Sequence, residues 1–217
     1  MRNLIEKEFY LATHLLTFLF LGFTAMTFIP GYPILCGAFF VCFGMFQSYQ
    51  LGREDNDILY TVLLPVKKTD VVRAKYMAAV ILQTAAFILF ALFTGIRMTC
   101  LSNAGVYVTN ALMGANLIFL AFVLLIFAAF NVIFVGGFFM TAYRYGKPFV
   151  IFIVVTFCII GIAEVLHHLP GLGWMNTLDF SNLAQQLPVL LAAALLYVMA
   201  TAVSCKNAQN RFEKIDL

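Results

Sequence analysis

The chain has 217 residues, of which 63% are apolar and 11% are charged, and 24 of them are phenylalanines. Soluble globular domains average about 45–50% apolar and about 25% charged residues. A soluble domain of this size could not cover so much apolar surface, and large exposed apolar patches cause aggregation. The composition therefore excludes an ordinary soluble fold and predicts a single all-α, polytopic membrane domain over residues 1–217, with the lipid bilayer as its solvent. The net charge of +3 is too small to indicate a charged partner, and no nucleic-acid partner is expected.

Residues 1–11 precede the first apolar run and mix apolar with charged side chains. Leu4 and Phe9 stand among charged residues such as Lys7 and Glu8. This pattern is typical of a short helix that lies in the cytoplasmic membrane interface before the chain turns into the bilayer. A disordered arm is the alternative.

Apolar segments of the length that can cross a bilayer recur along the chain, since a spanning helix needs about 20 largely apolar residues. We expect six transmembrane helices, at residues 12–28, 33–48, 77–96, 112–135, 148–165 and 187–204. The turn signal Ile29-Pro30-Gly31-Tyr32 separates the first two. Residues 50–76 form a charged segment between the second and third spans, and residues 167–186 form a mixed polar segment before the sixth.

The uneven distribution of lysine and arginine predicts the orientation of these spans. With the N-terminus inside, twelve of the thirteen basic residues fall on the inside and only Arg97 falls outside. Cytoplasmic segments of membrane proteins collect Lys and Arg. Residues 98–143 carry no formal charge, but two spans there would place Arg144, Lys147 and the basic C-terminal tail outside. We therefore expect one span in this region and both chain ends in the cytoplasm.

Residues 50–76 carry most of the information about function. An acidic cluster opens the segment, and the apolar run 58–66 that follows is too short to span a membrane and contains Pro65, a residue excluded from helix interiors. Thr69 is then placed to cap a helix whose first turn contains Asp70. The apolar run needs cover from lipid headgroups or from a partner protein. An interfacial loop with snorkelling lysines is the alternative.

The string LPVKKTDVVRAKY at residues 64–76 resembles the LPVSR-x-x-IV-x-x-KY signature of the ABC-2 type permease family, the small membrane subunits of bacterial ATP-driven exporters. Lys67 and Lys68 stand where Ser and Arg are common in that signature. As in that family, the string follows an acidic stretch, here at residues 54–57, and precedes the third span. The predicted layout of spans extends the resemblance, to ABC-2 or type V exporters, over most of the chain.

In that family the loop between spans two and three forms a coupling helix that sits in a groove of a separate ATPase. The resemblance assigns this ATPase-coupling role to Leu63, Leu64, Pro65, Val66, Lys67, Lys68, Asp70, Arg73, Lys75 and Tyr76. Among them, Arg73, Lys75 and Tyr76 would fix the element to the membrane. The resemblance also implies a second permease copy in a homodimer, two ATPase subunits that bind ATP and magnesium, and re-entrant outer helices within residues 167–186. No cofactor is expected in this chain.

These features predict the permease subunit of an ABC exporter in the bacterial plasma membrane, working by alternating access. The chain has no G-x-x-x-x-G-K-[ST] motif to hold nucleotide phosphates, so ATP hydrolysis is assigned to another polypeptide. The apolar and aromatic spans suit a hydrophobic or amphipathic substrate such as a peptide. The alternatives are a non-transporting assembly or sensor protein and an intramembrane enzyme, which would need clustered acids or histidines inside the spans.

Polar residues in or beside the spans are candidates for lining a translocation path: Gln47, Ser48, Asn131 and Glu164. Hydrogen bonding between helices is the alternative role for the first three. An intramembrane acid is a functional candidate by default, although Glu164 lies near the outer boundary. His167 and His168 would point about 100° apart on a helix, so they are poorly placed to share a metal, and no metal site is expected.

Overall fold

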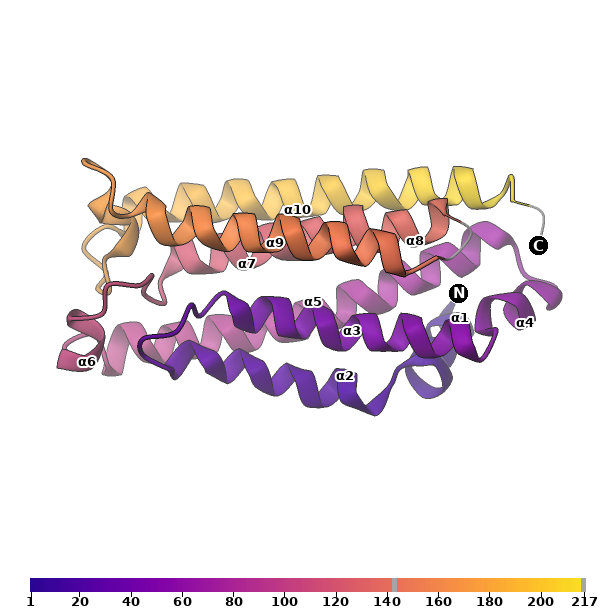
Figure 1. Ribbon diagram of the computed structural model, residues 1–217, viewed down its shortest axis with the longest axis horizontal. Coiled ribbons are helices and arrows are strands. Elements are labelled where there is room, and N and C mark those ends of the chain that lie inside the picture. Colours follow the sequence, from indigo (N-terminus) through magenta and orange to yellow (C-terminus); the bar gives the residue numbers. More distant parts are fainter. Residues whose placement is uncertain (142–143, 216–217) are drawn as a thin grey trace.

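The long helices of the molecule lie side by side along one axis. The computed structural model describes residues 1–141 and 144–215, and every regular element in that part of the chain is a helix, as predicted. Figure 1 shows the long helices running along the long axis, with shorter ones at the two ends. The long elements are α2 (Leu15–Phe20) continued by η2 (Leu21–Phe28), α3 (Cys36–Glu54), α5 (Lys68–Cys100), α7 (Leu117–Ala129), α9 (Gly146–Leu166) and α10 (Leu183–Phe212).

The short helices mark the two ends of this bundle. They are α1 (Arg2–Lys7) with η1 (Glu8–Ala12), α4 (Asp57–Leu63), α6 (Gly105–Val108) and η4 (Gly173–Asn176). The chain bends by 88° between the N-terminal helical segment and α2–η2. The N-terminus with α1, helix α4 and the end of α10 lie at one end of the molecule, and α6 lies at the opposite end (Figure 1). Segments that the charge distribution assigns to one side of the membrane therefore gather at one end of the fold.

Four helices within the described ranges are long and apolar enough to cross a membrane: Lys68–Cys100, Leu117–Met140, Gly146–Leu166 and Leu183–Phe212. Counting the bent pair Arg2–Leu11 and Leu15–Phe28 as one span gives a fifth. Helix α3 occupies the predicted second span but is not among them. Its apolar first half is followed by polar residues, including Gln47, Gln50 and Arg53. A multi-pass membrane fold follows from these helices, and the number of six spans stays a prediction.

The helix in the region of the predicted fourth span runs from Leu117 to Met140. It begins there because Asn116 caps it, with its side-chain oxygen accepting a hydrogen bond from the backbone N–H of Phe119 at 3.0 Å. Within this helix, α7 is followed by one stretch of π-helix, η3 (Phe130–Val135), and then by α8 (Gly136–Met140). A π-helical turn inside an α-helix is uncommon and is often found at functional positions.

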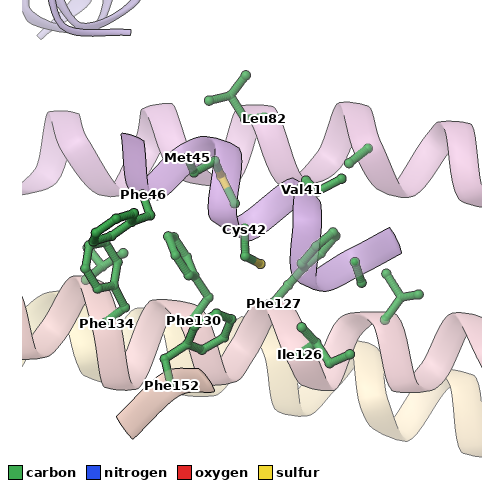
Figure 2. Packing of buried hydrophobic residues seen from close by; sticks show 14 of the residues in the cluster. Val41, Cys42, Met45, Phe46, Leu82, Ile126, Phe127, Phe130, Phe134 and Phe152 are labelled. Carbon is green, nitrogen blue, oxygen red and sulfur yellow. The ribbon is translucent and has the colours of Figure 1, made fainter. Parts of the chain in front are cut away.

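Helix α7 and its continuation form the centre of the bundle. In its most apolar stretch 72% of the residues are buried, against 17% for α10. A helix that is apolar on every side is expected to be buried on every side. Figure 2 shows Phe127 and Phe130 packed against Cys42 and Met45 of α3. The less buried helices α9 and α10 leave apolar faces for contact with lipid.

Two glycines allow α3 to cross the first helix at close range. A Cβ atom added to Gly44 would lie 2.5 Å from the Cβ of Phe20, and one added to Gly37 would lie 2.7 Å from the backbone oxygen of Phe23. Helices in membranes associate through such small residues because the backbones can approach closely. The hydroxyl of Thr17 donates to the backbone oxygen of Gly44 at 2.7 Å and strengthens this crossing.

Candidate functional site

The segment that connects α3 to α5 folds as a short helix and a tight bend. Asn56, with a φ of +52°, ends α3 in the left-handed conformation that Asn tolerates better than most residues. Helix α4 starts at Asp57 and ends before Leu64, which is extended because it precedes Pro65. Helix α5 then begins at Lys68.

The start of α5 differs from the prediction in one detail. We expected Thr69 to cap this helix, but the helix begins one residue before Thr69, and its N-cap residue is Lys67, which makes no side-chain capping bond. Asp70 does lie in the first turn, where its negative charge is favourable next to the helix dipole.

Helix α4 has one buried and one exposed face. Ile58 and Thr61 are each 4% exposed and pack inward, whereas Leu63 is 76% and Leu64 is 56% exposed. Tyr60 extends the same apolar surface and is 66% exposed. An apolar surface of this kind at the polar end of a membrane protein is a feature of contact sites.

A buried cluster of four charges fixes α4 in place, and we call it the ion network: Lys7, Glu8, Asp57 and Lys75. The ammonium group of Lys75 lies 2.6 Å from one oxygen of Glu8 and 3.1 Å from one oxygen of Asp57. The ammonium group of Lys7 lies 2.8 Å and 2.6 Å from the other oxygens of the same two carboxylates. All four side chains are at most 16% exposed.

The ion network balances its own charge, with two carboxylates and two ammonium groups. Burial alone would raise the pKa of Asp57, but the neighbouring Lys75 and Lys7 outweigh it and hold the pKa below its ordinary value. The carboxylate is therefore ionised at neutral pH. Buried ion pairs of this kind add little net stability, but removing one member leaves an uncompensated buried charge. The network thus acts mainly by enforcing one arrangement of the three segments it joins, which are α1–η1, α4 and α5.

The remaining residues assigned to coupling lie around α4 and the first turns of α5. Pro65, Lys67 and Arg73 are exposed, and Val66, Lys68 and Asp70 are half-buried. The ammonium group of Lys68 donates to the backbone oxygen of Ile215 at 2.6 Å. The C-terminal tail therefore packs on the same segment.

Tyr76, the last residue of the signature, is 2% exposed and points into the bundle. The hydroxyl groups of Tyr76 and Ser204 lie 2.8 Å apart, and both lie within hydrogen-bonding distance of the backbone oxygen of Asn131, at 3.3 Å and 3.1 Å. This oxygen belongs to the π-helical stretch and also accepts the amide of Gly136. Tyr76 thereby joins α5 to η3 and α10.

A second layer of hydrogen bonds lies deeper between the same three helices. The side-chain amides of Asn131 and Gln83 exchange two hydrogen bonds of 2.9 Å each. Asn131 also donates to the hydroxyl of Thr201 at 3.0 Å, and the hydroxyl of Tyr197 donates to Gln83 at 2.7 Å. These groups, together with Tyr76 and Ser204, form a polar seam between α5, η3 and α10, and we use that name below.

The other path candidates contact neighbouring helices or loops. Ser48 lies 2.7 Å from the hydroxyl of Thr17 and accepts the amide of His14 at 2.9 Å. Glu164 accepts the amide of Met113 at 2.8 Å, at the end opposite the ion network. Gln47 is half-buried.

The histidine pair and Arg97 lie at the end opposite the ion network. The ring of His167 lies 3.2 Å from the backbone oxygen of Ala111. Arg97 is 4% exposed, donates to the backbone oxygen of Thr27 at 2.7 Å, and its guanidinium lies 4.1 Å from the ring centre of Tyr107. The one basic residue predicted on the outside thus caps the end of η2.

Sequence reasoning did not identify Glu8 and Asp57 as the partners of Lys75, the addition of Lys7 to the same network, or the partners of Asn131 in the polar seam. A signal existed for Gln83, because a single amide within an apolar span is costly unless it is paired. For the ion network the only signal was that residues 1–11 and 50–76 both contain acids and lysines close to predicted membrane boundaries.

Several apolar helices long enough to cross a bilayer, with polar segments gathered at the two ends, define a multi-pass helical membrane protein. A model of the family described as ABC-2 family transporter protein matches residues 3–209, and the chain belongs to this family. The resemblance drawn from residues 64–76 is thereby confirmed. Membership makes the chain the permease component of an ABC transporter and implies an ABC ATPase partner. No curated protein and no solved structure matches the chain.

Proposed function

We propose that this chain is the permease subunit of an ATP-driven exporter and that a separate ATPase docks on the surface made by α4 and the bend that follows it. The observation that carries the proposal is the exposure of Leu63, the last residue of α4, and of Leu64 directly after it, next to a buried ion network that attaches α4 to the bundle. A docking element has to be exposed in order to bind and firmly attached in order to transmit motion. Helix α4 meets both conditions.

The proposed orientation places the end with α4 and both termini in the cytoplasm. It is supported by the positive-inside distribution, in which twelve of thirteen basic residues fall on that side. The chain would then cross the membrane six times, with α3 as the second span in contact with α2, α7 and the start of α5. Its polar second half would be accommodated because Ser48 hydrogen-bonds to Thr17 and His14 rather than facing lipid.

The proposed cycle is alternating access. ATP binding would close two ATPase subunits, and each would move α4 of one permease in a homodimer. The motion of α4 would reach the interior through two neighbouring residues of α5. Lys75 connects α5 to α4 in the ion network, and Tyr76, the next residue, connects α5 to η3 and α10 in the polar seam. We propose a hydrophobic or amphipathic substrate, such as a peptide, because the spans are apolar and aromatic. ATP and magnesium would be bound by the partner.

The test is co-purification of the tagged chain with its candidate ATPase, encoded by a neighbouring gene. We would compare the wild type with the double variant Leu63→Asp/Leu64→Asp, which changes only exposed side chains of the proposed surface. The matched control is Val106→Asp/Val108→Asp, because both valines are 61% exposed on α6 at the opposite end. Val66→Asp/Lys68→Glu extends the test to half-buried residues of the bend.

We expect the wild type and the α6 variant to retain a roughly equimolar ATPase and the α4 variant to lose it. Equal retention by the α4 variant would show that the ATPase docks elsewhere. If no ATPase co-purifies with the wild type, a different cytoplasmic partner of α4, as in an assembly or sensor protein, becomes the better hypothesis.

A further inference from the structure

A groove runs between α5 and α10 on the outer surface of the bundle. It has a volume of about 550 Å³, and its walls include Met77 and Val80 of α5 and Val198 and Ala202 of α10. Met77 is 43% and Val198 is 61% exposed. The polar seam lies behind it, since Tyr76 also lines the groove.

One end of the groove is positively charged. Arg73 of α5 and Lys206 of α10 both line it and both are exposed. The two helices run in opposite directions, so Arg73 near the start of α5 and Lys206 near the end of α10 meet at the same end of the bundle (Figure 1). Within the described residues neither side chain is in an ion pair, in contrast to Lys7 and Lys75 of the ion network.

The groove is long enough to hold the first part of an acyl chain next to its charged end. Arg73 and Val80 are seven residues apart on one helix, which corresponds to about 10 Å along its axis. An apolar channel of this length that begins at two exposed cations is complementary to a molecule with an anionic head and an apolar tail. Basic pockets between membrane helices bind anionic lipid headgroups in this way.

We propose that this groove binds an anionic phospholipid, with its phosphate between Arg73 and Lys206 and one acyl chain along Met77, Val80, Val198 and Ala202. The bound lipid would touch Tyr76, whose hydroxyl joins α5 to η3 and α10. A bound lipid would therefore stabilise the hydrogen bonds by which Tyr76 connects residues 64–76 to η3 and α10. The assignment to the inner leaflet rests on the orientation proposed above, whereas the binding itself does not depend on ATPase docking.

The test uses the full chain purified in detergent and titrated with phosphatidylglycerol or with phosphatidylcholine that carries the same acyl chains. Bound lipid is counted by native mass spectrometry, and thermal unfolding is followed in parallel. The variant Arg73→Gln/Lys206→Gln removes the charged end. The matched control Arg211→Gln/Lys214→Gln removes two charges that line a separate hollow at the same end of the molecule. Ala202→Trp fills the groove without changing its charge.

We expect phosphatidylglycerol to bind more tightly than phosphatidylcholine and to raise the unfolding temperature of the wild type and of the control. The Arg73/Lys206 variant should bind phosphatidylglycerol at least about tenfold more weakly, because each basic residue near an anionic surface contributes roughly 1 kcal/mol. Ala202→Trp should lose binding while keeping its charges.

Four results would overturn the proposal. Equal binding of the two lipids, or unchanged binding by the Arg73/Lys206 variant, would show that the cations do not select the lipid. Equal stabilisation by glycerol phosphate alone would identify a site for free anions. A disulfide between Cys205 of two copies in membranes, mapped by mass spectrometry, would show that a second copy covers the groove, because Cys205 lines it.

Discussion

The ammonium group of Lys75 lies 2.6 Å from a carboxylate oxygen of Glu8, and the two residues are 67 positions apart in the sequence. This contact joins the N-terminal helix to the first turns of α5, and Asp57 adds α4 to the same joint at 3.1 Å. A force applied to α4 would therefore reach α5 and the N-terminal helix together. The predictions below test this joint, its neighbours and the packing that supports them.

Replacing Lys75 by methionine should destabilise the protein by about 3–5 kcal/mol, because Glu8 and Asp57 would then share only Lys7 in a buried site. Adding Glu8→Gln should recover part of the loss, since it restores neutrality. Thermal unfolding of the purified chain measures both effects. The control is Arg2→Met/Glu6→Gln, which removes an ion pair on the exposed surface of α1, with side chains 88% and 54% exposed. Unfolding unchanged by Lys75→Met would show that the ion network does not hold α4.

The stability of the protein should fall at acid pH partly through Asp57. Its pKa is lower in the folded state than the ordinary value of about 3.9 in an unfolded chain. A depressed pKa contributes stability above the unfolded value, and this stability is lost as the pH falls through the folded value. The unfolding temperature should therefore lose the contribution of Asp57 only below about pH 4.

The variant Asp57→Asn should unfold at a lower temperature at neutral pH and show a smaller loss of stability than the wild type below about pH 4. The difference between wild type and variant as a function of pH isolates this residue. A difference that grows toward low pH would contradict the sign of the shift.

Replacing Asn131 by alanine should destabilise the bundle by about 1–3 kcal/mol, because the amide of Gln83 would lose its two-way hydrogen bonds in a buried position. The control is Thr84→Val, since the hydroxyl of Thr84 bonds only to the backbone of its own helix. In the same detergent, the unfolding temperature of Asn131→Ala should lie clearly below that of Thr84→Val. Equal effects would mean that the polar seam contributes no contact between helices.

The crossing of α2 and α3 should not tolerate a side chain at Gly44. Gly44→Ala places a methyl group 2.5 Å from the Cβ of Phe20, and overpacking of this kind costs about 1–3 kcal/mol. Gly95→Ala is the control, because a Cβ at that position meets nothing within 4 Å and alanine favours the helix. We expect the first variant to unfold earlier than the wild type and the second to match or exceed it. A stable Gly44→Ala variant would place the two helices farther apart than described.

The sequence was sufficient for the membrane class and the family, because both depend on local patterns. Apolar runs identify helices that face lipid, and thirteen consecutive residues, 64–76, carry the signature. The charge count predicted that residues 50–76, the N-terminal arm and the basic tail share one side of the membrane. Figure 1 shows α1, α4 and the end of α10 at one end of the molecule, and the side of the membrane stays a prediction.

The contacts of the site were not predictable, because each joins residues far apart in the chain. Glu8 and Lys75 were both read as charges at a membrane boundary, and nothing local indicates that they meet. Arg97 was read only as an external charge, but it donates to the backbone oxygen of Thr27 at the end of η2 and lies over the ring of Tyr107. The π-helical stretch at Phe130–Val135 has no distinctive composition, and its contacts with Tyr76 and Ser204 join residues far apart in the chain.

The π-helical stretch at residues 130–135 contains one residue more than regular α-helix would need to bring Gly136 to the same face. A π turn holds one residue more than an α turn, so deleting one residue there would let the helix return to regular winding. The extra residue and the smaller rotation per residue of the π turn offset each other, so Gly136 and the residues after it would keep nearly the same face of the helix. Gly136 now faces Ser204 and Tyr76 so closely that a Cβ at that position would lie 2.7 Å from the hydroxyl of Ser204. A deletion within the π stretch would therefore leave this close approach in place, whereas the same deletion in the α-helical part, α7, would turn Gly136 away from Ser204 by about 100°.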